Sequence, residues 1–423
     1  MKRKLVKGIL VMLLFNMILI ASGCWDRYEI TDVAQVWIIG VDRLPEMEGY
    51  ILTLQIISPS EASNTITGGG GGTDPMEKAV WVTTAQCKSI SDAVGVVSQL
   101  SPRKLAFDYP RAIVFGEEIA REGIGPILDY FQREHRFRRT MRIFIAKGTT
   151  AQAVLEANPR LEKSPSVAMI NILRWSEKAG NTLSVNLGDF LLALNREGMD
   201  PVANMVVIHD NSEVVEAERI IPKNKQPEER GLGIKRDSLE LRMAGNAIFA
   251  DDKLVDWLDV EETKGYMLAV NKAKPGIIDT EHEEVNKKMA FQNLSSKSKI
   301  IPQISDDGRL SFLIKAKIRA NLVEQMDNLR LDKEEVQKSL EDLLAATVKD
   351  AVRKAVEKAQ KNKTDIFGMG VELYRTYPKL WKEKYKDNWS EIFARVPVEI
   401  QVEAKINNIG VILETLERKG LVE

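Results

Sequence analysis

Two cysteines are the most reactive side chains in this chain of 423 residues, and their surroundings differ. Cys24 follows the small residues Ala21, Ser22 and Gly23, which end a short apolar run. Cys87 closes the apolar, β-branched segment AVWVTTAQC. We expect Cys87 to be a small buried hydrophobe, since burial keeps a thiol protonated and unreactive. Because two cysteines cannot form a disulfide framework, Cys24 is the one whose chemistry needs an explanation.

The segment before Cys24 has the parts of an export signal. It carries a basic start with Lys2, Arg3, Lys4 and Lys7, then an apolar run over residues 9–20, then the small residues. The run is shorter than the roughly 20 residues of a membrane-spanning helix. A cysteine directly after small residues is typical of bacterial lipoprotein signals. We therefore predict a signal peptide over residues 1–23 and diacylglyceryl and N-acyl modification of Cys24, with an uncleaved signal anchor and an incidental cysteine as the alternative.

The remaining residue types do not form a catalytic or metal-binding pattern. The three histidines lie far apart, without the H-E-x-x-H or Cys/His spacing of zinc sites: His135, His209 and His282. There is no G-x-S-x-G motif of a nucleophilic serine. The acidic pairs at 251–252 and 306–307 stand between apolar runs, which favours turns over metal sites. The sequence thus predicts no catalytic residue, no metal ligand and no cofactor.

Two groups of side chains could serve recognition. The densest basic cluster is REHRFRR at 133–139, with Arg142 beyond it. It could bind lipid headgroups, polyphosphate or an acidic partner, although we favour a solvated helix end whose arginines oppose the helix dipole. Five aromatic residues could anchor an interface, although core packing is favoured for most: Trp25, Tyr28, Trp381, Tyr385 and Trp389. A formal net charge of -1 argues against a nucleic-acid protein.

Apolar periodicity predicts an N-terminal α/β domain over residues 24–206. Two strands with a polar turn, containing Pro45 and Gly49, form a hairpin at its start. A helix follows from Ser91. A strand at 112–115, a helix around 124–131 and a strand at 142–146 then make an α/β unit. Further helices and the strand ANMVVIH complete the domain, and a charged stretch rich in Pro and Gly follows it as a linker.

A second region, residues 236–423, is predicted to be α+β, with a possible inner boundary near 276. It begins with a hairpin that turns at 251–252. A long amphipathic helix is expected from Asp332, with Glu335 completing its cap. The segments SFLIKAKIRANL and RVPVEIQVEAKI alternate apolar and charged residues, and the outer row is basic in the first and acidic in the second. We expect the two strands to be neighbours with cross-strand charge pairs, and the helix to cover their apolar face.

Taken together, these patterns predict an α+β or mixed α/β protein with several domains. Its sheets should be mixed or antiparallel and covered by helices, and the C-terminal domain should hold the long helix.

Several segments together resemble the Ger(x)C family of spore germination lipoproteins. They are GCWDRYEI after the signal, GVD following the first strand, SPRKLAFDYPRAIVFGEEIAREGIGPILDYFQREHRFRRTMRIFIAKG, AGNAIFADDKLVDWL and DIFGMGVELYRTYPKLWKEKYKDNW. The resemblance follows nearly all of the chain after the signal, in order, and departs from the family pattern at Ala21 and Asp256.

The resemblance implies a C subunit of a nutrient germinant receptor that is not an enzyme. Such a subunit is lipid-anchored on the outer face of the inner spore membrane and acts with two integral-membrane subunits, A and B, without nucleic acid. Only Cys24 carries over as a functional residue. An extracytoplasmic solute-binding lipoprotein and a tethered cell-envelope enzyme are the alternatives, although a solute-binding protein should show two similar lobes.

Overall fold

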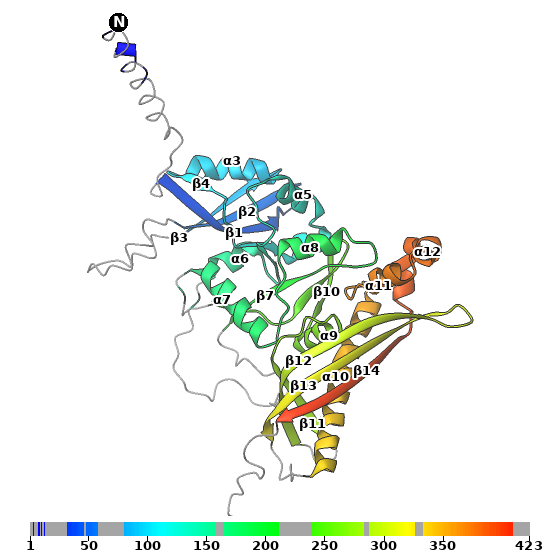
Figure 1. Cartoon of the computed structure of the whole chain (residues 1–423). Helices are drawn as coiled ribbons and strands as arrows, with labels where there is room; N and C mark the ends of the chain where they lie inside the picture. Colours follow the sequence, from blue (N-terminus) through cyan, green and yellow to red (C-terminus); the bar gives the residue numbers. More distant parts are fainter. Residues whose placement is uncertain are drawn as a thin grey trace, which may run out of the picture.

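The computed structural model describes residues 32–45, 48–57, 80–157, 164–210, 239–282, 287–325 and 333–408, with a few single residues at 3, 7, 8, 10, 12, 159 and 162. Figure 1 shows an upper body built on a mixed sheet between helices and a lower body in which a long helix lies along a second sheet. The α+β class, the two sheets with their helices and the long C-terminal helix confirm the predicted fold class.

The first sheet has ten strands, of which eight follow the order β10-β9-β7-β6-β5-β1-β2-β3, while β4 pairs with β1 and β8 with β7. Its strands are β1 (Val33–Arg43), β2 (Tyr50–Ile57), β3 (Val80–Cys87), β4 (Lys104–Ala106), β5 (Ala112–Gly116), β6 (Arg142–Ala146), β7 (Val202–Asp210), β8 (Leu239–Arg242), β9 (Asn246–Ala250) and β10 (Lys253–Leu258). Strands β4 and β5 run parallel to β1, β6 runs parallel to β5, and β7 to β6. The predicted hairpin of β1 and β2 is confirmed.

Helices cover both faces of this sheet. They are α3 (Ile90–Leu100), α4 (Glu117–Glu122), α5 (Gly125–Arg133), α6 (Ala151–Glu156), α7 (Pro165–Lys178) and α8 (Leu187–Leu194). One core cluster joins α3, α4, α5 and α8 to one face, while α6 and α7 pack on the other with Ile38, Val114 and Phe144. Strand β5 is therefore buried along its whole length, as expected for a parallel strand covered on both sides.

The second sheet has the order β11-β12-β13-β14 and begins at the predicted inner boundary near 276. Its strands are β11 (Ile277–His282), β12 (Lys287–Ile304), β13 (Leu310–Gln325) and β14 (Val398–Asn408). Strands β13 and β14 are parallel neighbours, and Lys317 Nζ lies 2.6 Å from Glu403 Oε2, which confirms the predicted pairing and its charge pair.

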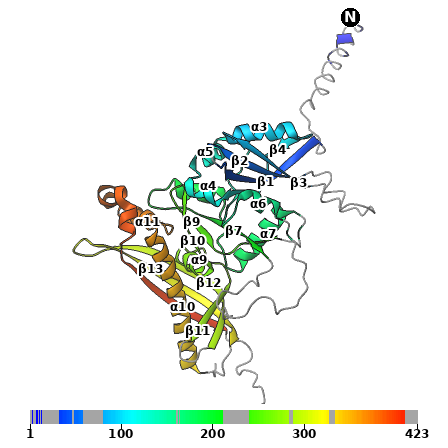
Figure 2. The ribbon, with the colours of Figure 1, turned by 180° about the vertical axis from the view of Figure 1, so that it is seen from behind.

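The long helix α10 (Glu334–Lys361) covers the apolar face of this sheet, as predicted. The strands lie in front of α10 in Figure 1 and behind it in Figure 2. The helix starts after Lys333, whose side chain makes no capping hydrogen bond; the expected cap Asp332 lies outside the described residues. Between α10 and β14 the chain forms α11 (Met369–Thr376), α12 (Pro378–Leu380), the π-helix η3 (Trp381–Tyr385), the 3-10 helix η4 (Lys386–Asn388) and α13 (Trp389–Phe393).

Helix α9 (Val260–Ala269) joins the two bodies. Its N-terminus is fixed by a capping box between Asp259 and Glu262. It then crosses α10 so closely that a Cβ added to Gly265 would lie 2.1 Å from the Ala351 carbonyl oxygen. One apolar cluster runs through both sheets and this crossing.

The domain boundaries at 206, 236 and 276 stay a prediction. The first sheet contains strands from both sides of the first two boundaries. Strand β9, which belongs to the second predicted region, pairs antiparallel with β7, which begins at Val202 inside the first. The β9–β10 hairpin thus completes the sheet of the first region.

Candidate interaction site

Cys24, the one site residue predicted from the sequence, lies outside the described residues, and so do Trp25 and Tyr28. Within the part of the chain that the structure describes, no helix is long and apolar enough to cross a bilayer. Cys87 is buried, as predicted, and its Sγ lies 3.5 Å from the Tyr50 carbonyl oxygen. Burial raises the pKa of the Cys87 thiol, which keeps it protonated.

Both acidic pairs lie in turns, as the sequence predicts. Asp251 has φ 52° in the tight turn between β9 and β10. The neighbouring Asp252 accepts a 2.9 Å hydrogen bond from the backbone N–H of Gly125 at the start of α5. Asp307 lies in the turn between β12 and β13, where Arg309 Nε donates to its Oδ2 at 2.5 Å. Among the described residues, no group of three or more His, Cys, Asp or Glu side chains could hold a metal ion.

The basic cluster divides into two parts. Arg133 ends α5 and its Nε donates to Asp129 Oδ2 at 2.7 Å, so the predicted helix-end role fits this residue. Arg136 forms two 2.9 Å hydrogen bonds to Glu134, and this guanidinium lowers the pKa of Glu134 to about 2. Arg138 and Arg139 lie beyond the end of the helix, where the helix dipole does not explain them.

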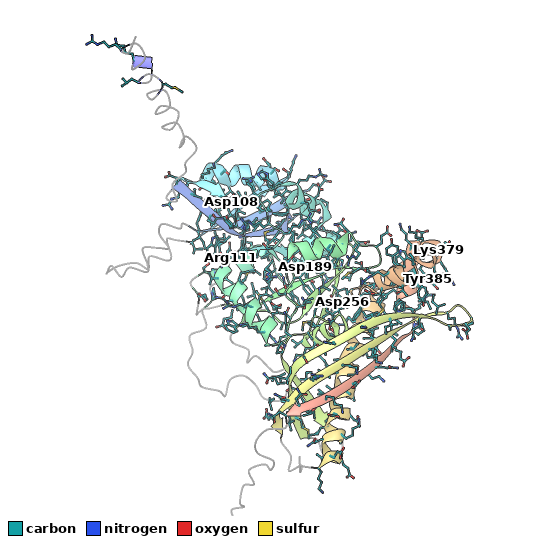
Figure 3. All side chains as sticks on the ribbon, in the orientation of Figure 1. Asp108, Arg111, Asp189, Asp256, Lys379 and Tyr385 are labelled. Carbon is teal, nitrogen blue, oxygen red and sulfur yellow. The ribbon has the colours of Figure 1, made fainter. Side chains whose placement is uncertain are left out.

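We call the surface around these last arginines the basic edge: Lys104, Tyr109, Arg111, Arg136, Arg138 and Arg139. Arg138 lies 4.3 Å above the Tyr109 ring, and Arg111 lies 4.1 Å above the ring of Trp37 in β1. Arg142 N–H donates to the Arg111 carbonyl, so the loops before β5 and β6 lie side by side. Figure 3 shows Asp108 and Arg111 on the upper body, beside β1.

A second group of residues forms the seam between the bodies, defined by Gly198, Asp200, Asp365, Gly370 and Trp389. The carboxylate of Asp365 accepts hydrogen bonds from the backbone N–H of Met369 at 3.0 Å and of Gly370 at 2.8 Å, and from Trp389 Nε1 at 2.9 Å. Asp365 is buried, and burial raises its pKa to about 7 in spite of these three donors.

Asp200 connects the seam to the first sheet. Its Oδ2 accepts from the Asp365 N–H at 2.7 Å, and its own N–H donates to the Asp365 carbonyl at 2.8 Å. Burial raises the pKa of Asp200 as well. The loop before β7 touches the start of α11 through its backbone, because a Cβ added to Gly198 would lie 2.8 Å from the Cα of Gly370.

Indole rings fill the seam beside these carboxylates. The rings of Trp381 and Trp389 meet at 5.2 Å between centroids, and Trp389 also packs on Phe312 of β13 at 6.1 Å. Trp381, Tyr385 and Trp389 are all buried, which confirms the favoured core role of these three aromatics. The segment DIFGMGVELYRTYPKLWKEKYKDNW therefore supplies the groups that join the two bodies.

The GVD segment has a similar structural role. Asp42 is buried at the end of β1, and its carboxylate accepts from the N–H of Ala151 at 2.7 Å and of Gln152 at 2.9 Å. It thereby caps α6 across the sheet. A Cβ at Gly116 would collide with this carboxylate at 2.1 Å, so Asp42 in this position requires glycine at 116.

Sequence reasoning did not identify Asp42, Asp200 or Asp365. Nothing in their spacing distinguishes them from surface carboxylates, since Asp42 and Asp200 accept from backbone N–H groups distant in sequence and Asp365 is joined to the distant Trp389 and Asp200 only by the fold. The only available signal was the adjacent glycines of GVD and FGMG.

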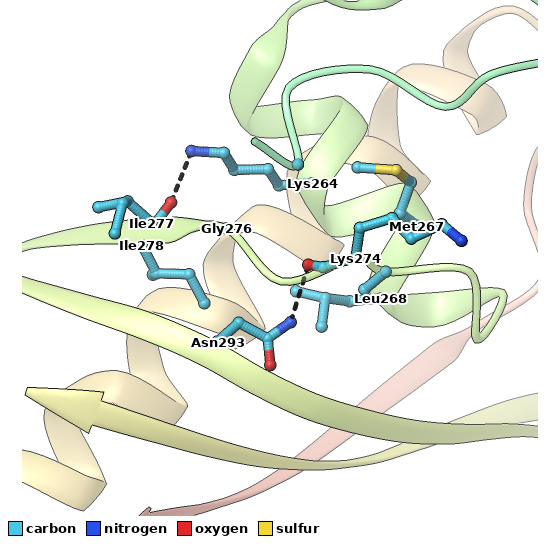
Figure 4. A pocket seen from close by; sticks show the side chains of 10 residues that line it. Lys264, Met267, Leu268, Lys274, Gly276, Ile277, Ile278 and Asn293 are labelled. Carbon is cyan, nitrogen blue, oxygen red and sulfur yellow. Dashed lines mark hydrogen bonds between the residues drawn. The ribbon is translucent and has the colours of Figure 1, made fainter. Parts of the chain in front are cut away.

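Two hollows adjoin the region where the bodies meet. One, of about 20 Å³, lies between α9 and β12, where Lys264 Nζ donates to the Ile277 carbonyl at 2.8 Å and Asn293 Nδ2 to the Lys274 carbonyl at 3.3 Å (Figure 4). The other, of about 30 Å³, is lined by Asp200 and Tyr266 among others. Each has room for one or two water molecules, whereas small-molecule pockets usually measure about 300 Å³ or more.

Comparison with known proteins identifies the family. Residues 26–208 match the family model described as the spore germination protein N-terminal domain, and residues 244–410 match the model described as spore germination B3/GerAC like, C-terminal. The chain belongs to the Ger(x)C family. This is a family of spore germination proteins and is not a known enzyme family.

Ger(x)C relatives match over nearly their full length. The chain is 28% identical to spore germination protein KC of Bacillus subtilis (strain 168) over 411 residues, covering 96% of each chain. It is 25% identical to spore germination protein B3 of the same organism, covering 94% of this chain and 97% of that one. The crystal structure of the GerBC protein matches with a TM-score of 0.54 at 19% identity, covering 88% of this chain and 97% of that one, which shows a shared fold.

Proposed function

We propose that this Ger(x)C protein is the lipid-anchored C subunit of a spore nutrient germinant receptor. Cys24 carries the acyl chains and holds the protein on the outer face of the inner spore membrane, where it acts with integral-membrane subunits A and B to trigger germination. The match of both family models, in order, along one chain is the observation that carries this proposal. The role is binding and assembly rather than catalysis.

A short export signal that ends at a cysteine supports the anchoring part of the proposal. Two acyl chains hold a protein stably on a bilayer, whereas one chain binds only marginally. The alternative of a solute-binding lipoprotein has less support, because the two sheets differ in strand number and order instead of forming two similar lobes.

Replacement of Cys24 tests the anchor. We expect Cys24→Ala to release the protein from spore membranes and to impair nutrient-triggered germination, because the thiol that accepts the lipid is gone. Fractionation of spores and mass spectrometry of the mature N-terminus measure both steps. Cys87→Ala is the matched control: its buried thiol has no part in anchoring, so this variant should stay on the membrane.

Full membrane retention of the Cys24→Ala variant, or a native protein with a bare thiol at Cys24, would contradict the proposal and indicate that the apolar run is the anchor. A saturable rise in thermal stability on addition of a nutrient to the isolated protein would instead favour the solute-binding alternative.

A further inference from the structure

The basic edge and the start of β1 lie on the same edge of the first sheet. Strands β1, β5 and β6 run in the same direction, so the loops that precede them meet at one edge. Lys104 pairs directly with Val33, the first residue of β1. The Arg111 N–H donates to the carbonyl of Trp37, four residues further along β1, at 2.7 Å.

Chain length keeps this edge near the proposed anchor. Val33 is the ninth residue after Cys24. Even fully extended, the chain from Cys24 to Val33 spans at most about 32 Å, because each residue adds about 3.3–3.6 Å. The start of β1 is therefore confined to a layer of that depth above the headgroups once Cys24 is acylated. This step rests on the proposed lipidation.

Most of the basic side chains on the basic edge are exposed to solvent. Arg111, Arg138 and Arg139 are exposed, and none of the three forms an ion pair with a carboxylate of the described residues. Four acidic side chains also lie near this surface. Asp108 is exposed, and the exposed Asp32 directly precedes Val33. The exposed Asp189 follows Gly188, whose N–H donates to the Arg139 carbonyl at 2.8 Å. Glu134 is half-buried and already paired with Arg136. Tyr109 is 56% exposed beneath Arg138. Exposed tyrosine beside arginine is typical of protein surfaces at the headgroup level of a bilayer.

We propose that the basic edge is a second membrane contact, which binds the phosphate groups of anionic lipid headgroups and orients the body on the bilayer. The lipid on Cys24 supplies attachment, and the arginines fix which side of the first sheet faces the membrane. The second sheet also has exposed basic side chains, such as Lys315 and Arg319 on its outer face, but no short segment of chain joins its strands to Cys24.

Vesicle binding without the lipid anchor tests this proposal separately from lipidation. The probe is the mature chain from residue 24 with Cys24→Ser, mixed with vesicles of phosphatidylcholine alone or of phosphatidylcholine with an equal amount of phosphatidylglycerol. We expect binding only to the anionic vesicles, and weaker binding as salt screens the charges. The pair Arg138→Gln and Arg139→Gln should weaken the partition constant about thirtyfold, roughly fivefold per arginine.

The matched control is the pair Lys315→Gln and Arg319→Gln, which removes the same charge from the outer face of the second sheet. This control should bind anionic vesicles like the parent chain, and circular dichroism and thermal melting should show that both variants are folded.

Three results would overturn the proposal: no preference for anionic vesicles, unchanged binding of the Arg138 and Arg139 variant, or loss of binding in the control. If only partner crosslinking in spores responded to Arg138 and Arg139, the basic edge would belong to an acidic protein partner. A bare Cys24 thiol in spores would contradict the anchor, whatever the vesicles show.

Discussion

At the scale of single residues, two buried carboxylates, Asp42 and Asp365, and the half-buried Asp200 hold this Ger(x)C protein together. Asp42, Asp200 and Asp365 each accept at least two backbone N–H groups. Removing an acceptor from buried donors costs about 1–3 kcal/mol for each donor left unpaired. These carboxylates therefore act as structural connectors between segments that are far apart in the sequence.

Asp365→Asn should make the stability of the protein less dependent on pH. The pKa of Asp365 is raised from 3.8 to about 7 in the folded state, so the folded protein holds this proton more tightly than the unfolded chain does. The protonated side chain therefore adds to the free energy of unfolding fully below about pH 4, and this contribution is lost as the pH rises through about 7. The asparagine cannot titrate, and its NH₂ group would face donors, so we also expect a loss of about 1–3 kcal/mol at acidic pH. Chemical denaturation across this pH range measures both effects.

The control for this prediction is Asp129→Asn. Asp129 is an exposed carboxylate whose pKa is lowered by Arg133, so its replacement should leave the fall in stability between about pH 4 and 7 in place. An unchanged fall in the Asp365→Asn variant would contradict the assignment. A smaller fall of the same sign should persist, because burial also raises the pKa values of Asp42 and Asp200.

Residues whose role depends on the neighbouring sequence could be predicted. Residues whose hydrogen-bond partners lie far away in the sequence could not. The small residues before Cys24 and the apolar setting of Cys87 are visible in a short window. The donors to Asp365 include Trp389, 24 residues away, and Asp200 lies 165 residues before it. Only the fold brings these groups together, so no local pattern could predict them.

At the scale of elements, α9 and α10 depend on a glycine at their crossing. A Cβ on Gly265 would lie 2.1 Å from the Ala351 carbonyl oxygen and 2.7 Å from the Val352 nitrogen. Both obstacles are backbone atoms, which no rotamer change can move. The closeness of the two helices therefore requires glycine at this position.

Gly265→Ala should destabilise the protein although alanine is the better helix former. We expect a loss of about 1–3 kcal/mol or more, because α9 must move away from α10. Gly95→Ala in α3 is the control: Gly95 has open space around its Cα, and alanine there should stabilise the helix by about 0.5–1 kcal/mol. Thermal unfolding of the two variants decides the point, and equal stabilisation of both would show that the crossing is looser than described.

Periodicity was a sufficient guide to elements with one buried face. The alternation in β13 and β14 predicted their pairing, the inward row and charge pairs between the strands, of which Lys317–Glu403 is one. Periodicity could not predict that α10 starts after Lys333, because capping depends on the backbone path that enters the helix. Periodicity also could not predict that β9 pairs with β7, because the pattern within a strand does not indicate which distant strand it pairs with.

At the scale of the whole molecule, the first sheet draws its strands from both family-model regions. Strand β9 pairs with β7, and Phe249 of β9 packs on Phe190 of α8 with 5.0 Å between the ring centroids. Without β9 and β10, the edge of β7 and a large part of the core would be exposed. The region matched by the N-terminal model is thus an incomplete folding unit.

A fragment of residues 24–210 should therefore aggregate or unfold at much lower denaturant than a fragment of residues 24–259, which retains β8, β9 and β10. Exposed strand edges and apolar surface promote association, and the longer fragment covers both. Size-exclusion chromatography and denaturant titration compare the two. Equal solubility and equal cooperativity of unfolding would contradict the view that the hairpin completes the sheet.

The β7–β9 pairing has a consequence for chimeras of this protein. A crossover at residue 244, where the C-terminal family model begins, would pair β7 from one parent with β9 from the other. The side chains and hydrogen bonds of this strand pair would then come from two different proteins. A crossover near residue 276 keeps the ladder within one parent, and the contacts that then have to be matched include the α9–α10 crossing, the Asp200–Asp365 contact and the packing of Gly198 on Gly370. Exchange of parts among relatives, in the laboratory or in evolution, should succeed more often at the second position than at the first.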